Sequence, residues 1–257
     1  MRLQDRVAIV TGAAGGLGAT YAQAIAREGG RVAVVDVLDG EGTAQGIRAL
    51  GRQARAFQAD LTDEQQVQGM VRQVVEEFGR IDILVNNAGG AGQQAAESEI
   101  EKIDRAHWDE IIAINLTTTM LCIKHVAPHM KRQRSGKIVN VSSRAARGTA
   151  WFGQVTPEYI AAKIGVIGLT RQLAKDLGPF GINVNCLVPS FTVSGPALQN
   201  AWDWMTDEER ARMIEATPLR RLPDPEELAS VVVFLVSDES SYVTGACLDV
   251  NGGSLMA

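Results

Sequence analysis

The chain has 257 residues, of which 46% are hydrophobic, 21% charged and 5% aromatic, a composition typical of a folded domain and not of a disordered or fibrous segment. Its 25 Lys and Arg against 30 Asp and Glu give a formal charge of −5, the wrong sign for binding nucleic acid through phosphates. The longest aliphatic or aromatic run, 231–236, has six residues, whereas a membrane-spanning helix needs about 20. We therefore expect one domain, 1–257, that neither binds nucleic acid nor crosses a membrane.

The cysteine content indicates a reducing compartment. Cys122, Cys186 and Cys247 lie far apart among apolar neighbours, form no CxxC pair and cannot all pair within one chain. We expect reduced core residues in a cytoplasmic protein. Residues 1–10 have charge before apolar residues, as a signal peptide does, but the run breaks at Thr11 and Gly12, so we expect it to form a first strand.

Short β-branched runs alternate with longer segments of helical pattern. These runs are 7–10, 31–35, 54–59, 83–85, 137–141, 182–188 and 246–250. Near-continuous apolar strands separated by crossover helices are typical of an α/β fold, a doubly wound, mostly parallel sheet with helices on both faces (Rossmann-like). Segment 190–217, with Gly195-Pro196, Trp202 and Trp204, fits this rhythm poorly and is interpreted as a small substrate lid inserted after a strand.

The first strand leads into a glycine-rich turn, residues 11–18, that reads TGAAGGLG. Glycine permits a sharp turn and lets the backbone approach a pyrophosphate, which the free N–H groups of the following helix then bind. The spacing is a variant of the GxGxxG fingerprint, and such a turn can also be mere structural punctuation. We predict that this loop binds a dinucleotide through Gly12, Gly15, Gly16, Leu17 and Gly18.

An acidic residue ends the next strand. Asp36 lies 18 residues beyond Gly18, where a carboxylate accepts hydrogen bonds from the ribose hydroxyls of an adenosine and repels a 2′-phosphate. No Lys or Arg lies within 12–18 to bind such a phosphate. These residues favour NAD over NADP, unless Asp36 merely begins a polar loop.

Tyr159 and Lys163 lie four apart in a helix-forming stretch that begins at Pro157, so both side chains project from one face. A phenol of pKa about 10 must lose about three units, or about 4 kcal/mol, to act as a base near neutrality. An ammonium about 4 Å away at an effective dielectric near 20 supplies roughly that much. Such a pair also arises by chance on many helices, so its context decides.

That context is polar residues at strand ends. Ser143 follows the strand 138–141, 16 residues before Tyr159, and Asn86, Asn87, Ala88 and Gly89 follow another strand. The carboxyl ends of parallel strands border the crevice in which open α/β sheets bind ligands. A hydroxyl there can bond a carbonyl or alcohol oxygen.

Taken together, these motifs resemble the short-chain dehydrogenase/reductase family over nearly the whole chain, 7–253. The likeness rests on TGxxxGxG, Asp60-Leu61, NNAG at 86–89, Asn115, Ser143, YxxxK at Tyr159 and the stretch 185–189. It implies that Tyr159 is the acid/base, that Ser143 orients the reacting oxygen, and that Lys163 binds the nicotinamide ribose and lowers the phenol pKa. It also implies that Asn115 holds a water in a proton relay.

The same resemblance implies further cofactor contacts and an assembly. Asp60 and Leu61 would flank the adenine, and Asn87, Ala88 and Gly89 would run beneath the ribose. The backbone after Pro189, above all Thr192 with Ser194 nearby, would meet the carboxamide. A homotetramer is implied, with helices 109–130 and 158–177 paired across one interface.

Three departures from the family pattern are visible. The interval from Ser143 to Tyr159 is longer than usual, which implies an insertion around 147–155 that affects substrate specificity. Pro189 is followed by Ser190 where glycine is usual, so the backbone there has less freedom. The stretch 251–253 reads NGG where an aspartate is common, with no expected chemical consequence.

Arg144 and Arg147 follow the serine, and Trp151 adds aromatic surface. Guanidinium groups bind carboxylates and sulfonates in bidentate fashion, so these residues indicate an anionic substrate such as a sugar acid, hydroxy-carboxylate or sulfonate. Alternatively, either arginine faces solvent or pairs with an acid of a neighbouring subunit.

The sequence therefore predicts an NAD-dependent dehydrogenase that interconverts a secondary alcohol and a ketone. The main alternative is a catalytically silent NAD-binding sensor or scaffold, against which the complete set Asn115, Ser143, Tyr159 and Lys163 argues. An enoyl reductase is less favoured, because such relatives usually space tyrosine and lysine further apart, and an epimerase would need a longer carboxyl-terminal domain. His125 and His129 have a zinc-binding interval, but no third ligand lies near them and Pro128 interrupts the helix, so we expect no metal.

Overall fold

A computed structural model describes residues 1–90, 100–148 and 155–255. It contains a parallel seven-stranded sheet in the order β3-β2-β1-β4-β5-β6-β7. The strands are β1 (Val7–Thr11), β2 (Arg31–Asp36), β3 (Ala54–Gln58), β4 (Ile83–Asn86), β5 (Gly136–Val141), β6 (Ile182–Pro189) and β7 (Cys247–Val250). The predicted doubly wound α/β fold is confirmed, and each predicted strand matches an observed one to within about one residue at either end.

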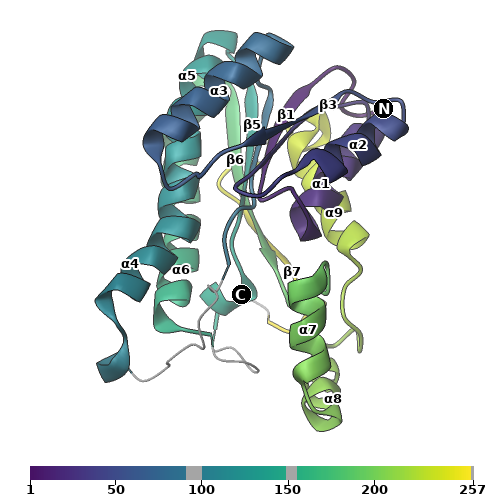
Figure 1. Ribbon diagram of the computed structural model, residues 1–257, viewed down its shortest axis with the longest axis vertical. Helices are drawn as coiled ribbons and strands as arrows, with labels where there is room; N and C mark the ends of the chain where they lie inside the picture. Colours follow the sequence, from purple (N-terminus) through teal and green to yellow (C-terminus); the bar gives the residue numbers. More distant parts are fainter. Residues whose placement is uncertain (91–99, 149–154, 256–257) are drawn as a thin grey trace.

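Helices cover both faces of the sheet. Figure 1 shows α1 (Gly16–Arg27), α2 (Glu41–Ala49) and α9 (Pro225–Val236) on one side of it, and α3 (Glu64–Phe78), α5 (Thr118–Gln133) and α6 (Pro157–Leu177) on the other. Alternate residues of β1 enter two separate cores, because Ala8 and Val10 pack with α1 and α9 while Val7 and Ile9 pack with α3 and α5. This double burial explains why the strands read as continuous apolar runs.

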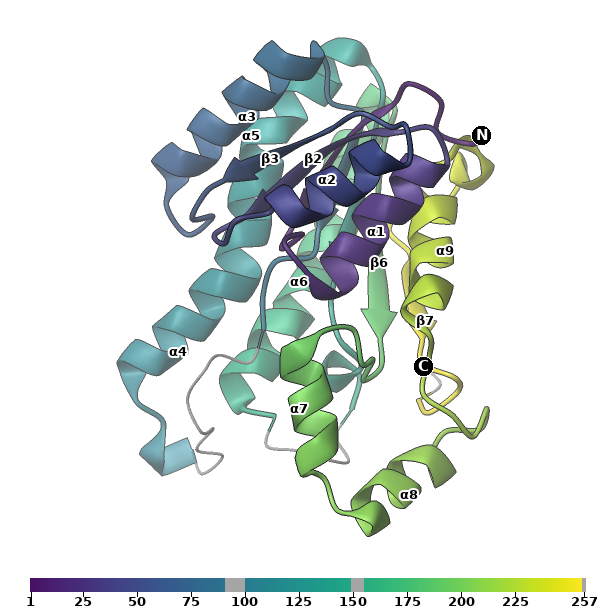
Figure 2. The ribbon, with the colours of Figure 1, turned by 45° about the vertical axis from the view of Figure 1, so that its right-hand side comes forward.

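The carboxyl ends of the strands meet at one edge, where the candidate site lies. β1 pairs with β2 on one side and with β4 on the other. The strand order therefore reverses its direction beside β1. Open α/β sheets bind ligands in the crevice at such a reversal. Figure 2 shows α7 (Pro196–Trp204) and α8 (Asp207–Glu215) beyond this edge, within the segment 190–217 that the sequence assigns to a lid.

The long helix before β5 carries an irregular turn. α4 (Arg105–Ile112), a π-helical turn (Ala113–Thr117) and α5 follow one another without a break. By length and composition the combined helix 105–133 could cross a membrane, but half of its most apolar window is buried inside the protein. Leu121, Val126 and Met130 pack against the sheet, so this is a core helix. π-Turns within α-helices occur frequently at functional sites.

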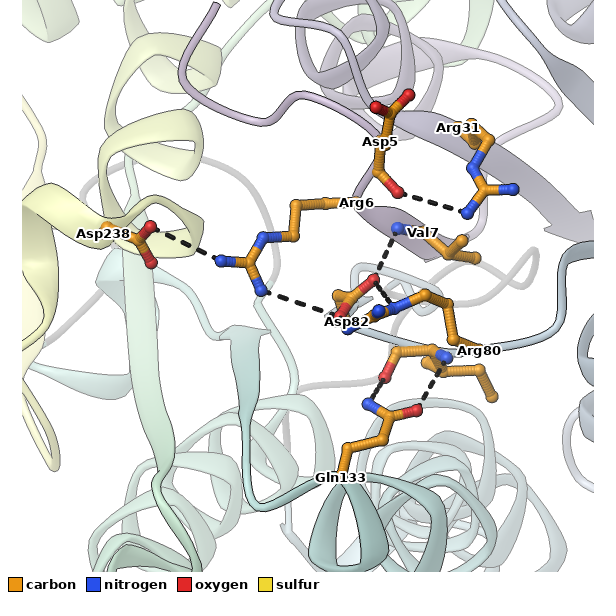
Figure 3. Close-up of polar contacts among 9 residues, drawn as sticks. Asp5, Arg6, Val7, Arg31, Arg80, Asp82, Gln133 and Asp238 are labelled. Atoms are coloured by element: carbon orange, nitrogen blue, oxygen red, sulfur yellow. Dashed lines mark hydrogen bonds and ion pairs between the residues drawn. The ribbon is translucent and has the colours of Figure 1, made fainter.

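The amino ends of the strands are joined by a buried carboxylate, Asp82, whose side chain is 2% exposed. Asp82 accepts hydrogen bonds from the backbone N–H of Val7 at 2.9 Å and from the Arg80 guanidinium at 2.6 and 2.8 Å. Arg6 lies 3.7 Å from Asp82 and 3.4 Å from Asp238 (Figure 3). The Gln133 side chain bonds the backbone of Ile81, which ties α5 to the same corner.

We predict that Asp82→Asn lowers the free energy of unfolding by about 1–3 kcal/mol, because an amide places N–H groups against the donors of Val7 and Arg80. Urea denaturation measures this change. Asp238→Asn is the matched control, since the Asp238 side chain is 82% exposed, and it should alter stability by less than about 0.5 kcal/mol. Equal effects of the two substitutions would contradict the role assigned to Asp82.

Candidate active site

The glycine-rich loop after β1 is shaped by close backbone contacts. Gly12 has φ +63°, and a Cβ there would lie 2.8 Å from the Cα of Ala88. A Cβ at Gly18 would overlap the carbonyl group of Gly12. These two positions require glycine, because the loop, the start of α1 and the segment after β4 share one small space.

The amino end of α1 is open toward the crevice. Its N-cap residue is Gly15, which provides no side-chain cap for the N–H groups of the first turn. A Cβ at Gly15 would meet no atom of the described residues within 4 Å, and Gly16 has φ +57°. Free N–H groups at a helix start bind phosphate, so the loop fits the pyrophosphate of a dinucleotide.

Thr11 fastens this loop to the segment after β4. Its hydroxyl oxygen accepts the N–H groups of Asn87 and Ala88, each at 3.0 Å. The Asn87 side-chain amide in turn donates to the carbonyl oxygens of Thr11 and Gly12 at 3.1 and 3.2 Å. The structure therefore brings together two of the predicted cofactor segments, 12–18 and 87–89, as a single unit.

Two carboxylates lie at neighbouring strand ends. Asp36 ends β2 and accepts the backbone N–H groups of Ala14 at 2.9 Å and Leu38 at 3.0 Å, so its carboxylate is held beside the glycine-rich loop. Asp60 follows β3 and accepts both the N–H and the hydroxyl of Thr62. Leu61 is buried next to it. Both carboxylates shape turns at the same edge of the sheet.

Ser143 and Tyr159 meet above the end of β5. Ser143 lies two residues beyond that strand in an extended conformation, and its hydroxyl is close enough to the phenol of Tyr159 to lower the phenol pKa. Tyr159 stands in the first turn of α6, which begins at Pro157 and is capped by the Thr156 side chain. The Nζ of Lys163 lies 5.6 Å from the centre of the tyrosine ring, on the same face of the helix.

Two opposing effects act on the pKa of the Tyr159 phenol. Burial raises the pKa of Tyr159, and the neighbouring Ser143 hydroxyl opposes that rise. The Nζ of Lys163 donates to the carbonyl oxygen of Val141 at 3.1 Å. The expected lowering of the phenol pKa by the Lys163 ammonium stays a prediction.

Burial destabilises the charged form of Lys163. Its side chain is almost inaccessible, and this desolvation lowers the lysine pKa from 10.5 to about 8. Because the folded pKa is the lower one, the buried charge destabilises the fold fully below about pH 8. That penalty fades between pH 8 and 10.5, as the unfolded lysine also loses its proton. A charge retained against such a penalty is typical of a functional site.

Asn115 lies in the π-helical turn and is fully buried. Its side-chain N–H donates to the carbonyl oxygens of Gly90 at 2.8 Å and Ile111 at 2.9 Å, and its oxygen accepts the N–H of Gly90 at 3.0 Å. Gly89 has φ +141°, and a Cβ there would overlap the Asn115 side chain. Asn115 therefore holds the segment after β4 in place, and the water relay implied by the resemblance remains a prediction.

Comparison with known proteins identifies the family. A family model described as enoyl-(acyl carrier protein) reductase matches residues 12–254. Cyclohexanol dehydrogenase of Rhodococcus sp. (strain TK6) is 40% identical over 268 residues, which cover 98% of this chain and 96% of that protein. The chain belongs to the short-chain dehydrogenase/reductase family.

Other relatives are alike over their full length. A 3-oxoacyl-[acyl-carrier-protein] reductase of Staphylococcus epidermidis is 38% identical over 256 residues, covering 98% of this chain and 100% of that protein. The crystal structure of levodione reductase superimposes with a TM-score of 0.90 and 33% identity, covering 98% of each chain. This member of the short-chain dehydrogenase/reductase family is accordingly an oxidoreductase of alcohols and ketones, and the family implies an NAD(P) cofactor.

The two arginines after Ser143 have different surroundings. The guanidinium of Arg147 donates to Asp249 and to the carbonyl oxygen of Cys247, each at 3.2 Å. We expected Arg147 to bind an anionic substrate, but its guanidinium is already paired with Asp249 of the same chain. Arg144 is half-buried and, within the described residues, has no hydrogen-bond or ion-pair partner. Trp151, the third residue proposed for the substrate, lies outside the described residues.

The segment after β6 turns back over the glycine-rich loop. Pro189 ends β6, and the buried hydroxyl of Thr192 donates to the carbonyl oxygen of Ser190 at 3.0 Å. The oxygens of Ser194 lie 3.5 and 3.6 Å from the position of a Cβ on Gly16. Ser194 thus lies beside the glycine-rich loop, and the contact of this segment with the carboxamide stays a prediction.

One polar pair beside the site escaped the sequence analysis. Nε2 of His107, on α4, lies 3.3 Å from Oε1 of Glu158, the residue before Tyr159. Glu158 is fully buried and His107 is mostly so. No local pattern connects these two residues, because their contact depends on α4 packing against the start of α6.

Proposed function

We propose that this protein is an NAD-dependent dehydrogenase that interconverts a secondary alcohol and a ketone, with Tyr159 as the acid/base. The observation that carries this proposal is the placement of the Ser143 hydroxyl beside the phenol of Tyr159 at the carboxyl edge of the sheet, with Lys163 on the same helix face. The glycine-rich loop follows β1 at the same edge. A silent NAD-binding protein would not need the buried lysine, which destabilises the fold at neutral pH.

Each side chain has a distinct task. A bound nicotinamide would supply the hydride chemistry at the alcohol or ketone carbon. Tyr159 moves the proton, giving it to the carbonyl oxygen in reduction and taking it from the alcohol in oxidation. Ser143 donates a hydrogen bond to the reacting oxygen or to the phenolate. Lys163, buried on the same helix face, supplies a positive charge that favours the phenolate.

The reaction is tested with a panel of secondary alcohols and their ketones, by following the absorbance of the reduced cofactor. Turnover of at least one alcohol supports the proposal. Binding of the cofactor with no turnover across acidic, sugar-like and hydrophobic alcohols would favour the silent sensor or scaffold. Reduction of a carbon–carbon double bond without alcohol oxidation would favour an enoyl reductase.

Asp36 supports NAD as the cofactor. Its carboxylate is fixed at the end of β2 by the N–H groups of Ala14 and Leu38, beside the loop that fits the pyrophosphate. An adenosine ribose placed there meets a negative charge, which bonds ribose hydroxyls and repels a 2′-phosphate. No cationic side chain within 12–18 compensates that repulsion.

We predict that Asp36→Asn raises the ratio of kcat/KM for NADP to that for NAD by at least about tenfold, which corresponds to about 1.4 kcal/mol. The amide keeps the size of the side chain and removes its charge. Steady-state kinetics with both cofactors measure the ratio. Asp39→Asn is the control, because Asp39 instead accepts the N–H of Glu41 at the start of α2. An unchanged ratio in Asp36→Asn would refute the assignment.

Arg144 supports an anionic substrate. It lines a cavity together with Phe191, Met213 and Thr217, and the lining also includes Arg221. Arg221 is already bound to Glu227 through two bonds of 2.6 Å. Burial lowers the pKa of Arg144, so a carboxylate or sulfonate that replaced the lost water would stabilise its charge. Substrates that fit are hydroxy-carboxylates, sugar acids and hydroxy-sulfonates with an apolar part.

We predict that Arg144→Gln raises KM for acidic secondary alcohols at least about tenfold and leaves KM for neutral ones unchanged, because only the anion loses its partner. The comparison uses matched acids and their methyl esters. Arg221 lines the same cavity but is already paired with Glu227, so Arg221→Gln should affect both substrate sets alike. An equal rise for acids and esters in Arg144→Gln would contradict the anionic substrate.

We also infer a homotetramer, in line with the resemblance. Met120 on α5 is 39% exposed and Ile164 on α6 is 50% exposed, so both helices present apolar side chains outward. These are the helices expected to pair across one interface. Light scattering of the purified protein measures the assembly.

A further inference from the structure

Cys186 and Cys247 are close neighbours in the sheet. They occupy directly paired positions on the adjacent strands β6 and β7, and both are free thiols. Neighbouring strands lie about 4.8 Å apart, and paired side chains point to the same face. That separation falls within the Cα distances of about 4.4–6.8 Å that disulfides span. All three cysteines are free, as expected, but their distance along the sequence gave no sign of this contact, because strand order sets it.

The two thiols have unequal surroundings. Cys186 is completely buried and its thiol donates to the carbonyl oxygen of Leu187 at 3.6 Å, whereas Cys247 is partly exposed on the last strand of the sheet order. The neighbouring Cys186 lowers the pKa of Cys247, and the guanidinium groups of Arg171 and Arg147 act in the same direction. The pKa of Cys186 is raised correspondingly. A thiolate beside positive charge is the nucleophilic form of cysteine.

Cys122, the third cysteine, serves as an internal control. Cys122 lies in α5 within the core between that helix and the sheet. Burial raises its pKa to about 12, and it has no cysteine partner. At neutral pH its sulfur therefore stays a protonated, inert thiol.

We propose that Cys247 and Cys186 form a redox-active dithiol that hydrogen peroxide oxidises to an intramolecular disulfide. The Cys247 thiolate attacks one peroxide oxygen, the O–O bond breaks, and hydroxide leaves with the electron pair, which gives a sulfenic acid. The sulfur of Cys186 then attacks the sulfur of Cys247, the S–O bond breaks, and the thiol proton leaves with hydroxide as water. Two thiols are oxidised and one peroxide is reduced to two waters.

The position of the pair suits a reversible site. Cys247 is partly exposed, and exposed disulfides are the more easily reduced ones. The pair also lies close to the catalytic machinery. Cys186 and Lys163 are near enough that the charge on each affects the pKa of the other, and Arg147 bonds the backbone of Cys247. Oxidation of the dithiol would thus modify residues beside the site and leave Ser143 and Tyr159 unmodified.

The test treats the reduced full-length protein with a small excess of hydrogen peroxide, then quenches it, denatures it and counts free thiols. We expect two of the three thiols to disappear, a linked peptide pair containing Cys186 and Cys247, and full recovery with dithiothreitol. Peptide mass spectrometry assigns the residues. Survival of all three thiols, oxidation of Cys122 at a comparable rate, or a disulfide between chains would overturn the proposal.

Three variants separate the steps. Cys122→Ser should still form the disulfide, and this variant keeps both reacting residues in their native environment. Cys186→Ser should stop at a sulfenic acid on Cys247 that dimedone traps, because the second thiol is missing. Cys247→Ser should leave Cys186 reduced at the same peroxide dose, since its sulfur is buried and protonated. Rapid peroxide oxidation of Cys186 in that variant would contradict the order of events. Circular dichroism establishes that each variant is folded.

Discussion

The parallel pairing of β1 with β4, and of β4 with β5, is the constraint on which the site depends. It sets the carboxyl ends of three strands side by side, at the edge where open α/β sheets bind ligands. The Thr11 hydroxyl, at the end of β1, accepts N–H groups of the segment after β4, while Ser143 follows β5 and lies beside Tyr159. The strand ladder thus holds the glycine-rich loop and the pair Ser143 and Tyr159 in one frame.

The two ends of the sheet serve different physical tasks. At the amino ends, the buried Asp82 accepts hydrogen bonds from Val7 and Arg80, which fixes the start of β1 against β4. At the carboxyl ends the groups are incompletely satisfied: α1 begins without a side-chain cap, Arg144 has no acidic partner within the part of the chain that the structure describes, and Lys163 keeps its charge under burial. Stability is concentrated at one end, and the capacity to bind and react at the other.

The sequence could predict the features that depend on residues close together in the chain. Apolar runs define the strands, the glycine spacing defines the loop, and the interval from Tyr159 to Lys163 places both on one helix face. The features it could not predict depend on contacts between distant segments. Asp249 occupies Arg147 because β7 adds to the edge beside β6, and the same strand order pairs Cys186 with Cys247. His107 reaches Glu158 only because α4 packs on α6, and the Lys163 ammonium bonds the carbonyl oxygen of Val141, 22 residues earlier in the chain.

The most direct test of the account removes one oxygen atom from the site. Tyr159→Phe keeps the ring in its place, and titration of the variant with NADH, followed by single-turnover kinetics, separates binding from chemistry. We predict a fall in turnover of at least about 100-fold, with a Kd for NADH within about threefold of the parent protein. Tyr242→Phe, which removes a fully exposed phenol, should change neither quantity. Turnover in Tyr159→Phe close to that of the parent protein would contradict the assignment of Tyr159 as the acid/base.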